Sequence, residues 1–411
     1  MKDPNENRKG YKKTKVGWIP NDWSECTLES LVKRNKPIVY GIVQAGPDIP
    51  GGTPYIRSTD VGDPLVSPVG LMRTSIEIAH KYRRSVVAGG DLVFSLRGNI
   101  GEVSEVPDEL EGANLTQGTA RLSLNGGGVA PFVRFALGAY FVRKNVDAWA
   151  KGSTFREITI EDLRRLTVPM PSEGECEEIA KILSSCEDLI RKSKDLIGAK
   201  QRQKKVLMQQ LLSGKKRLPG FAGQWRRCHL GDLFDERNQS KSNKLPLLAI
   251  TGSRGIIPAS EIDRKDSSSA DKSKYKVIEP GDIGYNTMRM WQGVSAVSSL
   301  RGIVSPAYTI CIPRPDVDVE YMGALFKFPP MVNKFWRFSQ GLVDDTLNLK
   351  FPNFAVIPVE VPGMEEQAAI ARVLKAADVE IKLLERKLSE FERQRKALMQ
   401  KLLTGEVRVK V

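Results

Sequence analysis

The sequence KVLMQQLLSG at residues 205–214 returns as KALMQKLLTG at residues 396–405, 191 positions further along the chain. Each copy closes a long stretch with helical spacing. Each also ends at a glycine, the residue that most readily adopts the left-handed backbone found after helices. A repeat of this kind is informative because it indicates the architecture before any single element is assigned.

Two further matches occur in the same order in both halves of the chain. They pair Trp23-x-x-Cys26-x-Leu28-x-x-Leu31 with Trp225-x-x-Cys228-x-Leu230-x-x-Leu233, and Gly90-Asp91-Leu92-x-Phe94 with Gly281-Asp282-Ile283-x-Tyr285. Chance could supply one such match, but three in register indicate a duplicated unit. We expect Trp23, Trp225, Leu28 and Leu230 to be packing residues.

The duplicated unit has a globular part and a helical part. Short apolar runs bounded by turn residues, such as Asp91–Ser95 and Ala355–Val361, predict a strand-rich domain. The helical part carries a heptad seam, which is typical of a helix that pairs with another helix. The seam positions are Cys186, Ile190, Ser193, Ile197, Lys200, Lys204, Leu207 and Leu211 in the first copy, and Ala377, Ile381, Leu384, Leu388, Phe391, Arg395, Leu398 and Leu402 in the second.

The connectivity predicts that the two helices run antiparallel. The second domain follows the end of the first helix and precedes the start of the second, and the termini of a compact domain usually lie close together. A helix over residues 179–212 would be about 50 Å long, so we expect a rod with one domain at each end. The predicted fold class is therefore α+β, with two strand-rich domains separated by a long antiparallel two-helix coiled coil and related by a pseudo-two-fold repeat. The expected boundaries are 1–16 for a flexible basic arm, 17–171 for the first domain, 172–215 for the first helix, 216–361 for the second domain and 362–411 for the second helix.

The composition describes a basic chain with enough apolar residues for a core. The 411 residues include 63 Lys and Arg against 49 Asp and Glu, a net charge of +14, which favours a polyanionic partner. No apolar run reaches the roughly 18–20 residues that a membrane helix needs, and the first sixteen residues lack the apolar centre of a signal peptide. We therefore expect a cytoplasmic protein without a membrane partner. The five cysteines and two histidines are scattered, which predicts reduced thiols and no metal site.

Two similar domains on a stiff spacer suit a ligand with its own repeat distance. Double-stranded DNA presents the same groove face about every 34–36 Å. The two domains would then read two separated half-sites, and these half-sites should differ because the domains differ in sequence. Two alternatives remain at this point: a protein-binding scaffold with two interaction domains, and an enzyme whose nuclease or methylase site the sequence does not reveal.

The repeated motifs resemble those of the specificity subunit of Type I restriction-modification enzymes, over nearly the whole chain from Gly17. The blocks Gly90–Gly101 and Tyr285–Gly293 are similar to blocks that recur in the target recognition domains of that family. Gly152-Ser153-Thr154 is similar to its end-of-domain motif, and Pro362-Gly363-Met364-Glu365-Glu366-Gln367 to its helix start. The first half departs from the usual form at Glu175-Cys176, where Glu-Gln is more typical.

The resemblance implies a noncatalytic subunit that reads an asymmetric bipartite DNA site, one half per recognition domain. It implies that the paired helices bind two modification subunits, which carry S-adenosylmethionine and methylate adenine N6. Restriction subunits that use ATP and magnesium would complete the complex, and this chain itself would hold no cofactor. The sequence agrees with a noncatalytic role. The motif Asn/Asp-Pro-Pro-Tyr/Phe, which binds the target base, is missing, because Phe328-Pro329-Pro330-Met331 has neither flanking residue. The phosphate-binding loop G-x-x-x-x-G-K-[ST] does not occur either.

Candidate DNA-contacting residues were chosen by their hydrogen-bonding chemistry and their expected position on loops. Arg and Lys read guanine edges and Asn and Gln read adenine, while small polar groups contact phosphates. Arg289, Trp291 and Gln292 form the densest cluster of this type, although Trp291 also suits a core position. The candidates are Tyr40, Gln44, Arg97, Asn99, Gln117, Lys151, Ser153, Thr154 and Arg156 in the first domain, and Arg254, Asn286, Arg289, Trp291, Gln292, Tyr308 and Gln340 in the second.

Overall fold

The structure is a computed structural model, and its chain divides into two compact units. The first unit comprises Met1–Ser193 and Lys387–Val411, and the second comprises Lys194–Arg386. No helix in the described part of the chain is both long and apolar enough to cross a membrane. The structure describes residues 5–126, 128–150, 152, 156–240, 245–252, 254–262, 271–343 and 346–411.

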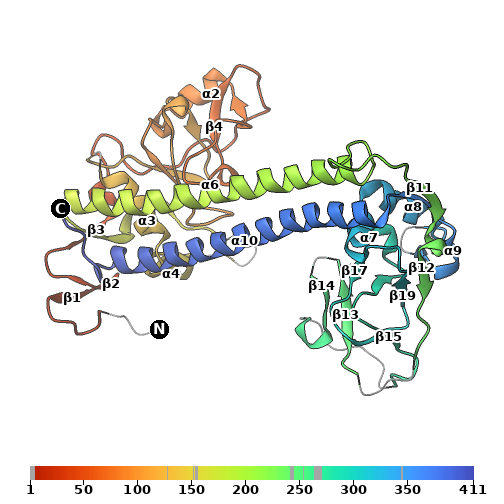
Figure 1. Ribbon diagram of the computed structural model, residues 1–411. Helices are drawn as coiled ribbons and strands as arrows, with labels where there is room; N and C mark the ends of the chain where they lie inside the picture. The colour runs from red at the N-terminus through yellow and green to blue at the C-terminus, as the bar shows by residue number, and fades with distance from the viewer. Residues whose placement is uncertain are drawn as a thin grey trace. The chain divides into compact units, whose positions relative to one another are not determined.

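Two helices of about forty residues each belong to both units (Figure 1). Helix α6 covers Glu173–Leu211 and helix α10 covers Met364–Leu403. Acidic residues in each first turn suit the positive end of the helix dipole. Gly214 (φ +68°) and Gly405 (φ +67°) adopt the left-handed conformation just after the helices, as predicted. Both helices end earlier than expected, and residues 404–411 form a separate tail.

The helices pair in antiparallel fashion in each unit. In the first unit, Arg395 Nη1 on α10 donates to Glu187 Oε1 on α6 at 3.0 Å. In the second unit, Lys200 pairs with Glu380 at 2.7 Å, and Lys204 pairs with Asp378. Partners that lie later in α6 lie earlier in α10, which confirms the predicted direction. The seam is also confirmed, since its predicted positions are all buried or half-buried in the structure.

The first unit contains short strands and helices around one main core. A central antiparallel sheet has the order β7-β6-β9, and β4 lies between β5 and β8 in a second sheet. The elements are β1 (Tyr11–Thr14), β2 (Gly17–Pro20), β3 (Ser24–Thr27), α1 (Leu28–Leu31), β4 (Thr53–Ile56), β5 (Arg73–Thr74), α2 (Ile76–Lys81), β6 (Leu92–Ser95), β7 (Val103–Glu105), β8 (Asn114–Leu115), β9 (Thr119–Leu122), α3 (Val129–Gly138), α4 (Tyr140–Trp149), α5 (Ile160–Arg165) and β10 (Thr167–Met170).

The second unit repeats the central sheet and extends it by one strand. Its order is β12-β19-β16-β17, beside a β13-β14 hairpin and a β15-β18 pair. The elements are β11 (Arg226–His229), β12 (Phe234–Glu236), β13 (Leu248–Thr251), β14 (Gly255–Pro258), β15 (Lys276–Ile278), β16 (Ile283–Asn286), the 3-10 turn η6 (Met290–Gln292), β17 (Ser295–Val297), β18 (Gly302–Val304), β19 (Tyr308–Pro313), α7 (Val319–Leu325), α8 (Pro329–Phe338), α9 (Phe351–Ala355) and β20 (Pro358–Val361).

Strand pairing confirms that the chain contains a duplicated unit. Strand β3 pairs with β10 in the first unit, and β11 pairs with β20 in the second, with Cys26 opposite Val168 and Cys228 opposite Val359. The sheets β7-β6-β9 and β17-β16-β19 are likewise equivalent. The α+β class, with two strand-rich domains and two long antiparallel helices, is therefore the observed fold.

A buried carboxylate in the first turn of each long helix joins the helix to its domain. Glu175 of α6 accepts hydrogen bonds from Trp23 Nε1 at 3.0 Å and from Arg408 Nε at 2.6 Å. In the second unit, Glu366 of α10 accepts two hydrogen bonds from Arg217, whose guanidinium lies 5.8 Å from the Trp225 ring centroid. We call these the two helix-start clusters.

The atypical Cys176 leaves the start of α6 with fewer hydrogen bonds than the start of α10. Gln367, its counterpart, accepts from the backbone NH of Asp318 at 2.9 Å and donates to the Pro362 carbonyl at 2.9 Å. The Cys176 thiol packs in the first core instead, and burial raises its pKa to about 12. The first helix start therefore relies more on Glu175.

The prediction of a flexible arm is wrong for residues 5–16, which pack as part of the first unit. Strands β1 and β2 form a hairpin, and Val16 is buried in the core. Asn5 Nδ2 donates to the Thr404 carbonyl at 3.2 Å, and the Tyr11 hydroxyl donates to the Gly405 carbonyl. The basic composition of residues 1–16 suggested a flexible segment. The order of this segment could not be predicted locally, because the acceptors of its hydrogen bonds lie almost four hundred residues away.

We predict that Arg408→Ala destabilises the first unit by about 1–3 kcal/mol, because it leaves the buried Glu175 carboxylate with fewer donors. Urea-dependent hydrogen exchange of amides in β3 and α6 measures this loss. The matched control is Arg165→Ala, which removes an ion pair whose side chains are 70% and 69% exposed and should cost less than about 1 kcal/mol. Equal effects of the two substitutions would contradict a structural role for the helix-start cluster.

Candidate nucleic-acid interface

The loop after β6 places two predicted residues on the surface of the first unit. Arg97 and Asn99 are exposed on either side of Gly98, which has a φ of +67°. Arg97 Nε donates to Glu157, and the backbones of these two residues form an isolated bridge. This contact holds the arginine on the rim of the sheet without burying it.

Tyr40, Gln44 and Gln117 lie next to this loop. The backbone NH of Gln117 donates to the Ile42 carbonyl at 2.9 Å, so that residues 40–44 run beside residues 116–120. Tyr40 is 51% exposed and Gln44 is exposed, while Gln117 is half-buried. Ser58 lies beside both Gly98 and Gly118. These contacts join the two loops into one surface, the first polar edge, made of Tyr40, Gln44, Ser58, Arg97, Asn99 and Gln117.

The remaining candidates of the first unit are placed less favourably or lie outside the described residues. Arg156 is exposed next to Glu157, but its Nη2 donates to the Asp147 carbonyl at 2.8 Å and so turns toward the end of α4. Lys151, Ser153 and Thr154 lie outside the residues that the structure describes.

The loop after β16 is the equivalent position in the second unit, and it carries four candidates. Asn286 Oδ1 accepts the Met288 backbone NH at 2.9 Å, and Trp291 Nε1 donates to the Met288 carbonyl at 3.1 Å. These hydrogen bonds fix a tight loop whose Arg289 and Gln292 side chains are exposed. Trp291 is half-buried, so it is neither a core residue nor a fully free one.

The other candidates of the second unit surround this loop to different extents. Tyr308 is opposite Asn286 on β19, and burial raises its pKa. Gln340 bridges to Asn348, and the next residue, Leu349, donates its backbone NH to the Thr287 carbonyl at 2.9 Å. Arg254 is exposed in the β13-β14 turn, where its Nη2 donates to the Glu261 carbonyl at 3.0 Å. The second polar edge is made of Asn286, Arg289, Trp291, Gln292, Tyr308 and Gln340.

Sequence reasoning missed several residues that share these surfaces. Ser58 contacts the loops that contain Gly98 and Gly118, which lie further along the chain. Nothing in the local sequence around Ser58 predicts these contacts. Trp336 is 47% exposed on α8, the helix that packs against η6. The usable sequence signal was that Trp336 lies off the helical face that Met331 and Phe335 define.

A half-buried lysine supports the loop that carries Arg289. Lys327 Nζ donates to the Gly293 carbonyl at 2.7 Å, and Gly293 ends η6 with a left-handed φ of +76°. Burial lowers the pKa of Lys327 to about 8. Lys204, Glu320, Lys375 and Asp378 line the same cleft as Lys327.

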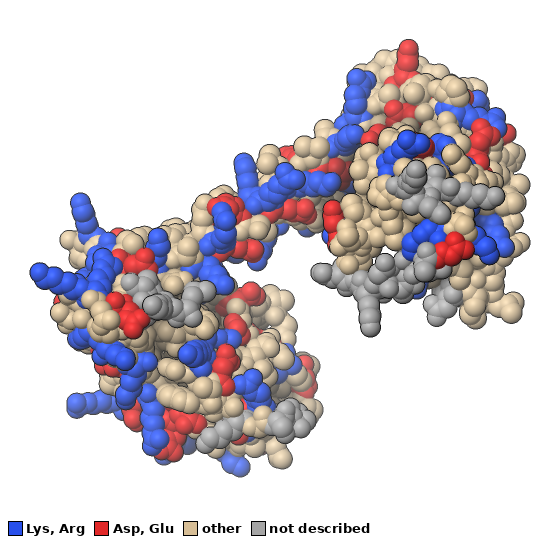
Figure 2. Space-filling view, turned by 90° about the horizontal axis from the view of Figure 1, so that it is seen from below, with Lys and Arg blue, Asp and Glu red and all other residues tan. Residues whose placement is uncertain are grey.

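Charge of both signs covers the face of the molecule seen in Figure 2, where Lys and Arg side chains are interspersed with Asp and Glu. Among the described residues, no group of three or more His, Cys, Asp or Glu side chains is arranged to hold a metal ion. The two units of the duplicated chain expose different polar residues at equivalent loops.

Comparison with known proteins shows what the chain is similar to. Residues 20–198 match the Type I restriction modification DNA specificity domain. The chain is 31% identical over 164 residues to the EcoBI specificity subunit of Escherichia coli, which is 40% of this chain and about a third (34%) of that subunit. It is 24% identical to the putative MjaX specificity subunit of Methanocaldococcus jannaschii, over 97% of both chains. The crystal structure of the S subunit of M. genitalium has the same fold, with a TM-score of 0.57 and 16% identity over 92% of this chain and 96% of that one. The chain is thus similar to the Type I restriction modification DNA specificity domain over residues 20–198, and to a specificity subunit over nearly its whole length.

We predict that the stability of the second unit rises with pH between about 8 and 10.5, because the pKa of Lys327 is lower in the folded state than its ordinary value of 10.5. In this window the unfolded chain binds more protons than the folded one, so rising pH favours folding. Urea unfolding midpoints measured across the window test the sign. Lys327→Met should remove most of this slope, whereas an unchanged slope would place the titration elsewhere.

Proposed function

We propose that this chain is the noncatalytic DNA specificity subunit of a Type I restriction-modification complex, with each domain reading one half of an asymmetric bipartite site. The observation that carries the proposal is the pair of polar edges. The loops after β6 and β16 occupy equivalent places in the duplicated sheet, yet one exposes Arg97 and Asn99 and the other exposes Arg289 and Gln292. Both loops carry an arginine and an amide, but the spacing between them differs and Trp291 lies between them in the second loop. This difference suits the reading of two unlike half-sites.

The exposed groups have the chemistry needed to distinguish bases. An arginine can donate two hydrogen bonds to guanine, and an amide can both donate to and accept from adenine. Both loops are held by backbone contacts, so their side chains are presented without a large loss of conformational freedom on binding. The basic net charge adds sequence-independent attraction to phosphates.

The partners follow from the family and are proposed on that basis. They are double-stranded DNA, two modification subunits that hold S-adenosylmethionine, and restriction subunits that use ATP and magnesium. The long helices support a docking role, because apolar side chains outside the seam are exposed on them. These are Ile182, Leu189, Leu196, Val206, Val379 and Leu383. A cytoplasmic location, where the DNA lies, is part of the same proposal.

Methylation mapping in a cell that carries this protein with its partner subunits tests the function. The expected result is adenine methylation at one bipartite motif with a fixed gap. Purified complex should also bind a duplex with that motif in a salt-dependent manner, losing about 10³ to 10⁵ in affinity between about 50 and 200 mM salt if six to ten phosphates are contacted. Salt-independent binding, or binding only to proteins, would favour a scaffold.

We predict that Arg289→Ala relaxes the preference at one half-site by about 1–3 kcal/mol and leaves the other half-site unchanged. Binding to duplexes with single base changes in each half measures this. Arg314→Ala is the matched control, since Arg314 follows the opposite end of β19 from Tyr308 and pairs with Asp235 at 2.9 Å. Uniform weakening on every duplex would show that Arg289 contacts phosphate only.

We also predict that helix length sets the gap between the half-sites. Removal of one heptad from each helix, residues 190–196 and 381–387, deletes about 10 Å of helix and preserves the seam register. The preferred gap should shorten by about three base pairs, given about 3.4 Å per base pair. A library of duplexes with different gaps measures the change, and an unchanged gap would rule out the helices as the spacer.

A further inference from the structure

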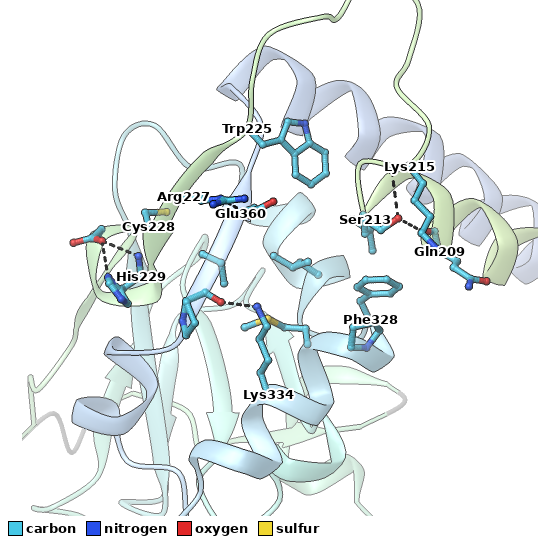
Figure 3. A pocket seen from close by; sticks show the side chains of 17 residues that line it. Gln209, Ser213, Lys215, Trp225, Arg227, Cys228, His229, Phe328, Lys334 and Glu360 are labelled. Atoms are coloured by element: carbon cyan, nitrogen blue, oxygen red, sulfur yellow. Dashed lines mark hydrogen bonds and ion pairs between the residues drawn. The ribbon is translucent and has the colours of Figure 1, made fainter.

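A cleft of about 690 Å³ opens at the base of the second unit, between the end of α6, β11, β20 and α8 (Figure 3). Leu212, Trp225, Phe328 and Met331 form its apolar part. Figure 3 shows the Trp225 ring and the Phe328 ring turned toward the opening, and Lys334 extending from α8. The cleft shares no residue with the second polar edge.

The equivalent surface of the first unit is covered by the chain itself. Ser213, Gly214 and Lys215 of the cleft region correspond in the repeat to Thr404, Gly405 and Glu406. In the first unit, the amino-terminal segment contacts all three of these counterparts. Asn5 Nδ2 donates to the Thr404 carbonyl, the Tyr11 hydroxyl to the Gly405 carbonyl, and Arg8 Nη1 to the Glu406 carbonyl at 3.1 Å.

The hairpin also supplies the apolar contacts on that surface. Val16 and Ile19 are 5% and 2% exposed in the first core, and Pro20 packs directly against Gly405. As a result, Trp23 is only 1% exposed. In the first unit, a β-hairpin with aliphatic side chains therefore buries this surface of the duplicated unit.

In the described part of the second unit, no hairpin takes this place. Between α6 and β11 the chain is only fourteen residues long, and it contains no strand. Trp225, the counterpart of Trp23, is half-buried, and its buried Nε1 has no acceptor among the described residues, whereas Trp23 Nε1 donates to Glu175. The same surface that is closed in one unit is therefore open in the other.

The charge on the rim is reversed between the two surfaces. In the first unit the hairpin contacts Glu406 and Glu25: Arg8 Nη1 donates to the Glu406 carbonyl at 3.1 Å, and the backbone NH of Lys15 donates to Glu25 Oε1 at 3.2 Å. Their counterparts at the open cleft are Lys215 and Arg227. Lys334 adds a third cation, and its Nζ donates to the Pro358 carbonyl at 2.7 Å. Carboxylates also line the rim: Asp232 lies 3.7 Å from His229 Nδ1, and Glu360 pairs with Arg227 at 2.7 Å. A second copy of the basic hairpin would be repelled here.

We propose that this cleft binds an acidic, extended segment of a partner protein, which places an aliphatic side chain against Trp225 and Met331 and carboxylates near Lys215 and Lys334. The occupant takes the place that the hairpin takes in the first unit, with the opposite charge. In the first unit the hairpin occupies the equivalent surface. The proposed site is independent of the proposed DNA reading, because no residue of either polar edge belongs to it.

The test uses two synthetic peptides and the full chain. The acidic probe has the sequence of residues 8–20 with Arg8, Lys9, Lys12, Lys13 and Lys15 each replaced by Glu, so that it keeps the aliphatic residues of the hairpin. The second probe is the unaltered basic peptide. Fluorescence anisotropy at low salt should show binding of the acidic probe, and at least about tenfold weaker binding of the basic one.

Substitutions in the cleft locate the site. The double variant Lys215→Glu and Lys334→Glu should weaken the acidic probe about tenfold or more, and Trp225→Ala should weaken it as well. Lys382→Glu, an exposed position on α10 outside the cleft, is the matched control and should bind as the unaltered chain does. Circular dichroism and the DNA preference of each variant show that the fold and the proposed reading function are retained.

Several outcomes would overturn the proposal. They are equal binding of the two peptides, no binding of the acidic peptide, or binding that the double variant leaves unchanged. Displacement of the acidic probe by duplex DNA, together with weaker DNA binding by the double variant, would assign the cleft to the nucleic-acid surface instead. Loss of half-site preference in the unaltered chain would count against the proposed function but not against this site.

Discussion

A buried carboxylate in the first turn of each long helix holds together chain segments that are far apart in sequence. Glu175 binds Trp23 and Arg408, so the start of α6, the first domain and the residues after α10 meet at one carboxylate. Glu366 and Arg217 repeat the arrangement in the second unit. A carboxylate that is about 3% exposed is costly without partners, and this cost selects one register for the helix pair.

This constraint explains why the two domains can differ so much at their polar edges. The helix-start clusters, the seam and the sheet order fix the scaffold in both units. The loops after β6 and β16 contribute little to that scaffold, so their side chains are free to change with the ligand. The tight backbone contacts of each loop nevertheless give the exposed side chains a defined position. The residues that stabilise the scaffold and the residues of the polar edges are thus different parts of the same duplicated sheet.

Much of the fold could be predicted from the sequence because the repeat and the heptad seam are local or periodic signals. The antiparallel direction, the helix-ending glycines and the strand-rich domains all followed from such signals. The site was harder. Arg289 and Gln292 were predicted and are exposed, but Ser58 was missed because its place beside Gly98 and Gly118 depends on long-range packing. The ordered hairpin was missed for a similar reason, since its acceptors belong to residues 404–406.

The hairpin also bears on how a duplicated chain becomes asymmetric. Duplication gives two copies of every surface, including the one beside Trp23 and Trp225. The amino-terminal hairpin covers one copy, and the reversed charges at Lys215 and Arg227 make the other unsuitable for the same cover. The hairpin in the first unit and the opposite charges at Lys215 and Arg227 in the second therefore both make the two equivalent surfaces different. An open apolar cleft leaves part of the half-buried Trp225 in contact with water at a cost in free energy, and an occupant would remove that cost.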